Sequence, residues 1–68
     1  MIRLTLDTCL ARHNMTRYRL AKETGVTYQI IDKYYKNKVV RYDSYVLDRI
    51  CAALNCDISE ILAYESES

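Results

Sequence analysis

The stretch GVTYQIIDKYYKNK, residues 25–38, contains the single glycine of a 68-residue chain that has no proline. Ile31 and Tyr34 follow at helical spacing, so the stretch predicts a helix that begins near Thr27. Long polar side chains occupy the other face of this helix. Gly25 directly before it predicts a corner between two helices, because glycine adopts a positive φ at little cost.

The residues before Gly25 predict the other helix of that corner. A helix from about Arg17 to Thr24 would end at the glycine, and the next helix would follow after about three residues. Helices joined by so short a connection cross steeply, which is the geometry of a helix-turn-helix. Five residues fall where two such helices pack together: Leu20, Ala21, Val26, Ile31 and Tyr34.

The same helix-start signal occurs five times along the chain. In each case a Thr or Asp has an apolar residue directly before it and another four residues after it, the pattern of an N-cap with a hydrophobic staple. The five are Leu4–Thr5–Cys9, Met15–Thr16–Leu20, Val26–Thr27–Ile31, Tyr42–Asp43–Leu47 and Cys56–Asp57–Ile61. We therefore predict an all-α fold, a compact five-helix single domain over residues 1–68, with the helix-turn-helix at about residues 16–37.

The start of the chain has an extended alternative. Ile2, Leu4 and Leu6 alternate as strand residues do, so residues 1–5 could precede the first helix as an extended segment. The fourth helix has a clearer pattern. Its apolar stripe lies at helical spacing: Val46, Leu47, Ile50, Cys51 and Leu54.

The C-terminal segment predicts one more helix and a polar tail. Asn55 suits the left-handed position that ends the fourth helix. Ile58, Ile61 and Leu62 then supply a last short amphipathic helix. The acidic tail, residues 65–68, is expected to fray.

Charge is distributed unevenly although the formal net charge is only +1. Residues 1–42 carry nine Lys or Arg and three acids, whereas residues 43–68 carry one Arg and six acids. A basic first part predicts a polyanionic partner, and an acidic second part would limit indiscriminate binding. The alternative is an ordinary solvated surface.

The cysteines predict neither a metal site nor a cofactor. Cys9, Cys51 and Cys56 form an odd set without CxxC spacing, and the lone His13 is a poor ligand candidate. We expect the thiols to be small core hydrophobes in a reducing, cytoplasmic environment. The sequence shows no signal peptide, membrane span or catalytic constellation, so we expect neither an enzyme nor a small-molecule ligand.

Two runs of sequence resemble a known family. TRYRLAKETGVTYQIIDKYYKNK, residues 16–38, resembles the helix-turn-helix of the Cro/CI (XRE-like) DNA-binding regulators. LDRICAALNCDISEILAY, residues 47–64, resembles the fourth and fifth helices of its small bacterial members. The resemblance implies a lambda-repressor-like domain that binds double-stranded operator DNA, usually as a homodimer, with the third helix in the major groove.

The resemblance also implies which residues face the bases. The matching positions of the recognition helix are Thr27, Tyr28, Gln29, Asp32 and Lys33. Gln29 can bond adenine at N6 and N7, and Lys33 can donate to guanine O6 and N7. Asp32 can accept from cytosine N4, orient Lys33 or repel wrong bases, while Tyr28 can contact a thymine methyl or a phosphate. The alternative for each residue is an ordinary wet surface.

Phosphate contacts are predicted on both sides of that helix. Arg17 matches the first residue of the family's second helix, and Asn37 and Lys38 match the loop after the third, both regions that contact phosphate. Asn37 stands where the family often has glycine, and asparagine tolerates a left-handed turn. Basic residues interleaved with tyrosines suit a phosphate backbone. The full predicted set is Arg17, Tyr18, Lys36, Asn37, Lys38 and Arg41.

The other tyrosines and the C-terminal part are candidates for protein contacts. Tyr34 continues an apolar stripe and is predicted to be core, whereas Tyr35, Tyr42 and Tyr45 line either the core edge or a dimer seam. A homodimer would use the apolar groups of the C-terminal part: Ile58, Leu62, Ala63 and Tyr64.

These patterns together favour a sequence-specific regulator, a repressor that occupies an operator. The alternative is a protein-interaction module, an antitoxin-like or adaptor subunit that uses the tyrosine-rich surface to bind another protein. Salt dependence separates the two, because phosphate neutralisation makes affinity fall steeply with salt.

Overall fold

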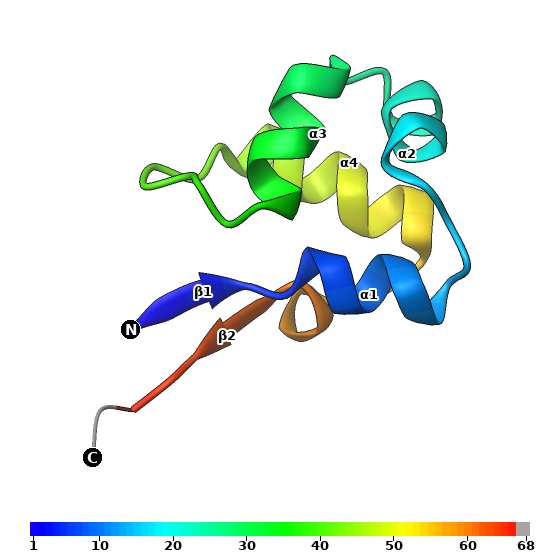
Figure 1. The fold of residues 1–68 in the computed structure, drawn as a ribbon. Helices are drawn as coiled ribbons and strands as arrows, with labels where there is room; N and C mark the ends of the chain where they lie inside the picture. The colour runs from blue at the N-terminus through cyan, green and yellow to red at the C-terminus, as the bar shows by residue number, and fades with distance from the viewer. Residues whose placement is uncertain (67–68) are drawn as a thin grey trace.

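The structure, a computed structural model, describes residues 1–66. Four α-helices, one 3₁₀ helix and two short strands follow one another along the chain (Figure 1). In order they are β1 (Ile2–Leu4), α1 (Leu6–Arg12), α2 (Arg17–Thr24), α3 (Tyr28–Tyr35), α4 (Ser44–Leu54), the 3₁₀ helix η1 (Ile58–Glu60) and β2 (Leu62–Tyr64). In Figure 1, α2 and α3 lie on one side of α4, and α1, η1 and both strands lie on the other.

The predicted compact helical domain with a helix-turn-helix is confirmed, but the fifth α-helix and the all-α class are not. Asp57 and Glu60 do form the expected capping box, but it opens only a single 3₁₀ turn. The chain then becomes β2, which pairs antiparallel with β1 with Leu62 opposite Leu4. A segment this short is a poor helix because helix nucleation is costly, and the edge of β1 offers its main chain other partners.

The extended alternative for the first residues is confirmed, since Ile2–Leu4 form β1. The sheet also continues into the predicted polar tail. The terminal ammonium of Met1 donates to the main-chain oxygen of Glu65, and the Glu65 N–H donates to the main-chain oxygen of Met1, both at 2.7 Å. Glu65 is therefore paired rather than frayed, and residues 67–68 of that predicted tail lie outside the described residues.

All five predicted N-caps are confirmed as the residues that precede a helix. Three of them accept a main-chain N–H with their side chains: Thr16 from Arg19, Asp43 from Tyr45, and Asp57 from Ser59. The left-handed ends are confirmed too, with φ of 76° at Gly25, 58° at Asn37 and 50° at Asn55.

The core forms where the helices meet. The residues predicted to pack α2 against α3 are buried, except Ala21, which is half-buried. Tyr34 is core as predicted, and its hydroxyl accepts the N–H of Asp43 at 2.9 Å. The full buried cluster is Leu4, Leu6, Cys9, Leu10, Leu20, Val26, Ile31, Tyr34, Val46, Ile50, Leu54 and Ile61.

Among the described residues, no helix combines the length and the apolar character that crossing a membrane requires.

Candidate nucleic-acid interface

The outer face of α3 carries the residues predicted to read bases. Burying Ile31 and Tyr34 turns Tyr28, Gln29 and Lys33 outward, and all three are exposed. Gln29 and Lys33 are one helical turn apart, so their side chains lie along one face. The side chain of Thr27 makes no capping bond to α3, which leaves its hydroxyl available for an outside partner. The structure thus brings these four residues together.

Asp32, the fifth predicted base contact, is engaged within the protein. One carboxylate oxygen accepts from the Arg17 guanidinium at 2.5 Å, and the other lies 3.1 Å from the Lys36 ammonium. The hydrogen bond from Lys36, followed by the bond from Arg17, holds the pKa of Asp32 below its ordinary value of 3.8, although burial opposes this. Of the three roles predicted for Asp32, orienting a cation has the best geometry, with Arg17 and Lys36 as its partners in place of Lys33.

Arg17 is fixed from two directions. Besides its bond to Asp32, its guanidinium lies over the ring of Tyr35, 4.3 Å from the ring centre. Arg17 is the first residue of α2, whereas Asp32 and Tyr35 belong to α3. The ion pair and the stacking therefore join the start of α2 to the C-terminal half of α3, and they hold the predicted phosphate ligand beside α3.

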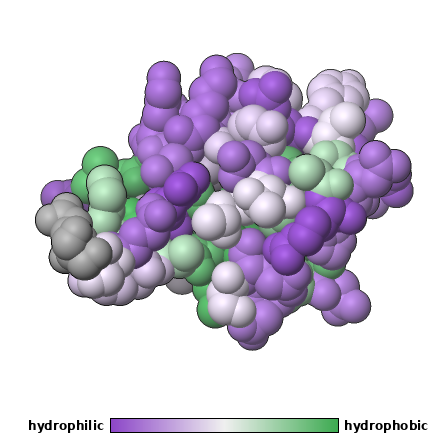
Figure 2. Space-filling view, turned by 60° about the horizontal axis from the view of Figure 1, so that its bottom comes forward, coloured by the Kyte–Doolittle hydropathy of each residue, from purple (hydrophilic) through white to green (hydrophobic). Residues whose placement is uncertain are grey.

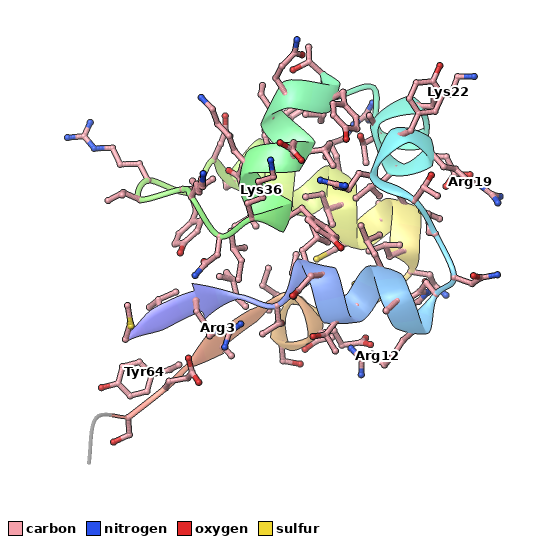
Figure 3. All side chains as sticks on the ribbon, in the orientation of Figure 1. Arg3, Arg12, Arg19, Lys22, Lys36 and Tyr64 are labelled. Carbon is pink, nitrogen blue, oxygen red and sulfur yellow. The ribbon has the colours of Figure 1, made fainter. Side chains whose placement is uncertain are left out.

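The exposed side of α2 adds further cations (Figure 3). Tyr18 is 63% exposed, and the Lys22 ammonium lies 5.3 Å from the centre of its ring. Arg19 pairs with Glu23 at 3.7 Å. In Figure 3, Arg19 and Lys22 project outward from α2, and Lys36 stands at the end of α3. These three cations and Tyr18 thus border the outer face of the helix-turn-helix.

The loop after α3 carries the other predicted phosphate contacts. Lys38 and Arg41 are exposed, and neither they nor Lys33 forms an ion pair within residues 1–66. Asn37 is different, because its side-chain oxygen accepts the main-chain N–H of Leu4 at 2.8 Å. The amide oxygen of Asn37 therefore joins this loop to β1, and its main-chain N–H donates to the main-chain oxygen of Tyr34, so its side-chain NH₂ group remains for a phosphate.

Arg49 is a structural residue that the sequence did not single out. Its Nε donates to the main-chain oxygen of Thr24 at 3.0 Å, and its guanidinium lies 5.5 Å from the centre of the Tyr45 ring. A cation at the C-terminus of α2 satisfies a free carbonyl and complements the helix dipole. It thereby ties α4 to the corner at Gly25. The spacing of residues along α4 does not predict this contact, because the contact depends on how α2 and α4 pack against each other.

Tyr35 and Tyr42 lie at the edge of the core, which is the first of the two placements predicted for them. Both are half-buried against the core, and the ring of Tyr42 lies 6.3 Å from that of Tyr34. Tyr45 is 60% exposed, so of these three tyrosines it has the most surface available for the other predicted placement, a dimer seam.

Comparison with known proteins bears on this arrangement. The family model for the Cro/C1-type helix-turn-helix DNA-binding domain matches residues 5–67. A crystal structure of a Bacteroides fragilis protein described as DNA-binding has the same fold, with a TM-score of 0.79 and 22% sequence identity. The match covers 93% of this chain and 100% of that one. No curated protein matches the chain. Since the family model spans nearly all of the sequence, the chain belongs to the Cro/C1-type helix-turn-helix DNA-binding domain family.

Proposed function

We propose that this protein is a sequence-specific transcriptional regulator that binds double-stranded DNA with α3 in the major groove, and that it represses by occupying an operator. The observation that carries the proposal is the outer face of α3, where Gln29 and Lys33 stand exposed one turn apart. Free cations follow in the next loop. A helix with this exposed polar face, set at the corner of a helix-turn-helix, fits the width of the major groove.

Base recognition falls to the residues on the outer face of α3 and at its start. Gln29 bonds an adenine through its amide, and Lys33 donates to a guanine. The free hydroxyl of Thr27 and the exposed ring of Tyr28 contact neighbouring bases or thymine methyl groups. Asp32 acts chiefly on Arg17 and Lys36, because both of its carboxylate oxygens bond to those cations.

Phosphate contacts come from the residues that surround this face. Arg17 presents a guanidinium already oriented by Tyr35 and Asp32, and so less side-chain entropy is lost on binding. The remaining contacts on either side of α3 come from Tyr18, Lys36, Asn37, Lys38 and Arg41. These contacts fix the register on the duplex and carry most of the salt dependence.

The proposal includes a homodimer that uses β2. In the two-stranded sheet the other edge of β2 has no neighbouring strand among the described residues. Since Met1 and Glu65 exchange main-chain bonds, the alternation of an antiparallel ladder turns the N–H groups of Leu62 and Tyr64 away from β1. A second copy can pair with this edge, and Tyr64 is 71% exposed beside it.

The hydrophobic surface of that end of the molecule is consistent with a protein contact. Figure 2, which brings the lower face of Figure 1 forward, shows hydrophobic side chains gathered at its left end. Met1, Ile2 and Val40, all exposed, border a shallow hollow of about 370 Å³ between β1 and the loop after α3. A dimer through this end leaves both copies of α3 free, at a spacing of about 34 Å on successive grooves. The three free cysteines fit the cytoplasm, a reducing compartment.

The experiment that tests the function is selection of binding sites from random duplex DNA, followed by titration of the selected site at several salt concentrations. We expect a two-fold related site. Gln29→Ala should relax the preference at one base position, and Arg17→Ala should weaken all sequences alike. Arg17→Ala also leaves Asp32 without one of its cations, and the carboxylate could then repel the DNA phosphates. The double variant Arg17→Ala, Asp32→Ala removes this repulsion, so comparing it with Arg17→Ala isolates the loss of the contact between Arg17 and phosphate. Arg12→Ala, on the opposite side of the molecule, is the matched control.

A different result would contradict sequence-specific DNA binding. If no sequence is enriched and binding is weak at low salt as well as high, the outer face of α3 is a protein-binding surface and the chain is an interaction module. The dimer is tested separately by sedimentation. Tyr64→Pro removes one outward N–H without touching the ladder to β1, so it should yield monomers that remain folded.

A further inference from the structure

A cluster of potential metal ligands lies on the side of the molecule away from α3. The sulfur of Cys9, a ring nitrogen of His13 and a carboxylate oxygen of Glu60 all lie within 4.8 Å of one another. Cys9 is fully buried in α1, and His13 is the exposed residue that ends this helix one turn later. Glu60 closes η1, which is 47 residues further along the chain than His13. The sequence spacing of the cysteines held no sign of this group, because its third member is brought in by the fold.

The chemistry of the three side chains favours one class of cation. One sulfur, one imidazole nitrogen and one carboxylate oxygen form a mixed donor set of the kind that Zn²⁺ accepts, whereas Ca²⁺ and Mg²⁺ prefer oxygen ligands alone. A thiolate and a carboxylate together carry two negative charges, and neutral imidazole adds none. A divalent cation would therefore be neutralised by its ligands, which is favourable at a partly buried place.

The geometry requires only a small adjustment. Zinc–ligand distances of about 2.0–2.3 Å place the ligand atoms of a tetrahedral site about 3.5 Å apart. The observed separations, at most 4.8 Å, therefore close by side-chain rotation without a change in the fold. His13 lies at the surface, so a water molecule from solvent can take the fourth position. In the capping box Glu60 uses Oε2 to accept the N–H of Asp57, which leaves Oε1 for a cation.

Arg12 competes for that oxygen. Its guanidinium lies 3.5 Å from Oε1 of Glu60, the only ion pair of this carboxylate among residues 1–66. A bound dication would displace this exposed and weak pair. Arg12 is labelled beside η1 in Figure 3, at the end of α1 that also carries the cluster. Because of this competition, removing Arg12 should strengthen metal binding, an effect that is not expected if the three side chains bind no metal.

We propose that Cys9, His13 and Glu60 form a binding site for Zn²⁺ that fastens the end of α1 to the turn before β2. On binding, the Cys9 thiol loses its proton to solvent and its sulfur forms the metal–thiolate bond. One proton is released for each cation bound, and no electron is transferred. Because only the folded chain brings the three ligands together, Zn²⁺ stabilises the fold by mass action.

The test uses the intact chain with Co²⁺ as the spectroscopic probe and Zn²⁺ as its competitor. We expect one Co²⁺ per chain, with a thiolate-to-cobalt absorption band that Zn²⁺ removes, and a thermal midpoint that rises on addition of Zn²⁺. His13→Gln and Glu60→Gln should each weaken binding by about tenfold or more, since even outer-shell changes cost metal sites that much. Arg12→Gln should strengthen binding, because it removes the competitor for Glu60.

Two features of the design keep the outcome interpretable. Cys9→Ser should abolish the band, but it alters a buried residue and could also disturb the fold. The main test therefore uses His13→Gln, which changes an exposed residue, and Glu60→Gln, which keeps a side chain that can still form the capping box. Cys51→Ser is the matched control, since it removes a thiol outside the cluster and should leave the affinity unchanged. Absence of Co²⁺ binding by the wild-type chain overturns the proposal. Binding that is unchanged in both His13→Gln and Glu60→Gln also overturns it.

Discussion

The two sides of the molecule use their cations differently. On the side of the strands, Arg3 lies 3.6 Å from Glu65 and Arg12 lies 3.5 Å from Glu60. The acids come from the end of the chain and pair with bases near its start. On the side of the helix-turn-helix, four cations have no ion pair among residues 1–66: Lys22, Lys33, Lys38 and Arg41.

This difference explains how a chain of net charge +1 can present a basic face. Residues 17–41, which make up α2, α3 and the loop after them, contain seven Lys or Arg and only two acids. The C-terminal acids neutralise the other end of the molecule because β2 pairs with β1. The positive excess is therefore concentrated around α3, where a phosphate backbone would lie.

The largest effect should follow from removing three of these unpaired cations, the ones in α3 and in the loop after it. In the triple variant Lys33→Gln, Lys38→Gln, Arg41→Gln, DNA affinity at moderate salt should fall on the order of a hundredfold, and the salt slope should decrease by about one for each lost phosphate contact. The measurement is titration of labelled duplex at several salt concentrations. The matched control, Arg3→Gln with Arg12→Gln, also removes positive charge but should change the slope little. Equal losses in the two variants would show that position does not matter.

A second prediction concerns the contact that joins the two sides. Asn37 holds a positive φ in the loop after α3, and its side chain accepts the N–H of Leu4 in β1. Asn37→Ala leaves that N–H without its partner and strains the backbone, so the free energy of unfolding should fall by about 1–3 kcal/mol. Denaturant unfolding measures it.

Asn37→Gly separates the two causes, since glycine keeps the left-handed backbone at no steric cost but loses the acceptor. It should therefore lie between the wild-type chain and Asn37→Ala in stability. If Asn37→Ala is as stable as the wild-type chain, the two sides are not coupled through this hydrogen bond.

The third prediction uses the one acid of α3. A pKa below 3.8 in the folded chain means that Asp32 stabilises the fold above the unfolded pKa, and that this contribution is lost as pH falls through the folded value. The wild-type chain should therefore be more stable than Asp32→Asn near neutral pH, and the difference should shrink as pH falls past 3.8 and disappear below the folded pKa of Asp32. Thermal unfolding of both proteins across this range is the measurement. A difference that is independent of pH would contradict the role of the Lys36 and Arg17 bonds.

Much of the fold could be predicted from the sequence because its signals are local. The N-caps at Thr16 and Asp43 act within one turn, and Gly25 needs no distant partner to adopt its positive φ. The error at residues 58–64 has the opposite cause. Asp57 begins a turn, as its local pattern predicts. The chain then forms a strand instead of a helix because it pairs with β1, which lies more than fifty residues earlier in the chain.

The candidate site divides in the same way. Helical spacing correctly predicts that Gln29 and Lys33 face outward, because burying Ile31 determines the rest of α3. It does not predict that Asp32 bonds to Arg17, since that contact depends on the angle between α2 and α3. The hydrogen bond of Arg49 to Thr24 and the approach of Glu60 to Cys9 likewise depend on the tertiary packing.

The smallest expected effect concerns the ion pair at the strands. Arg3 and Glu65 are both well exposed, and Nε of Arg3 has no hydrogen-bond partner among the described residues. Glu65→Gln should therefore lower the free energy of unfolding by only about 0–1 kcal/mol, and high salt should screen the loss. Asp48→Asn is its matched control, because it makes the same change in net charge at an exposed acid that has no ion pair among residues 1–66. If the two sides are separate, both variants leave site selection unchanged, and only Glu65→Gln alters stability. If Glu65→Gln changes the selected DNA site, the strand side takes part in recognition and the division of charge between the two sides is wrong.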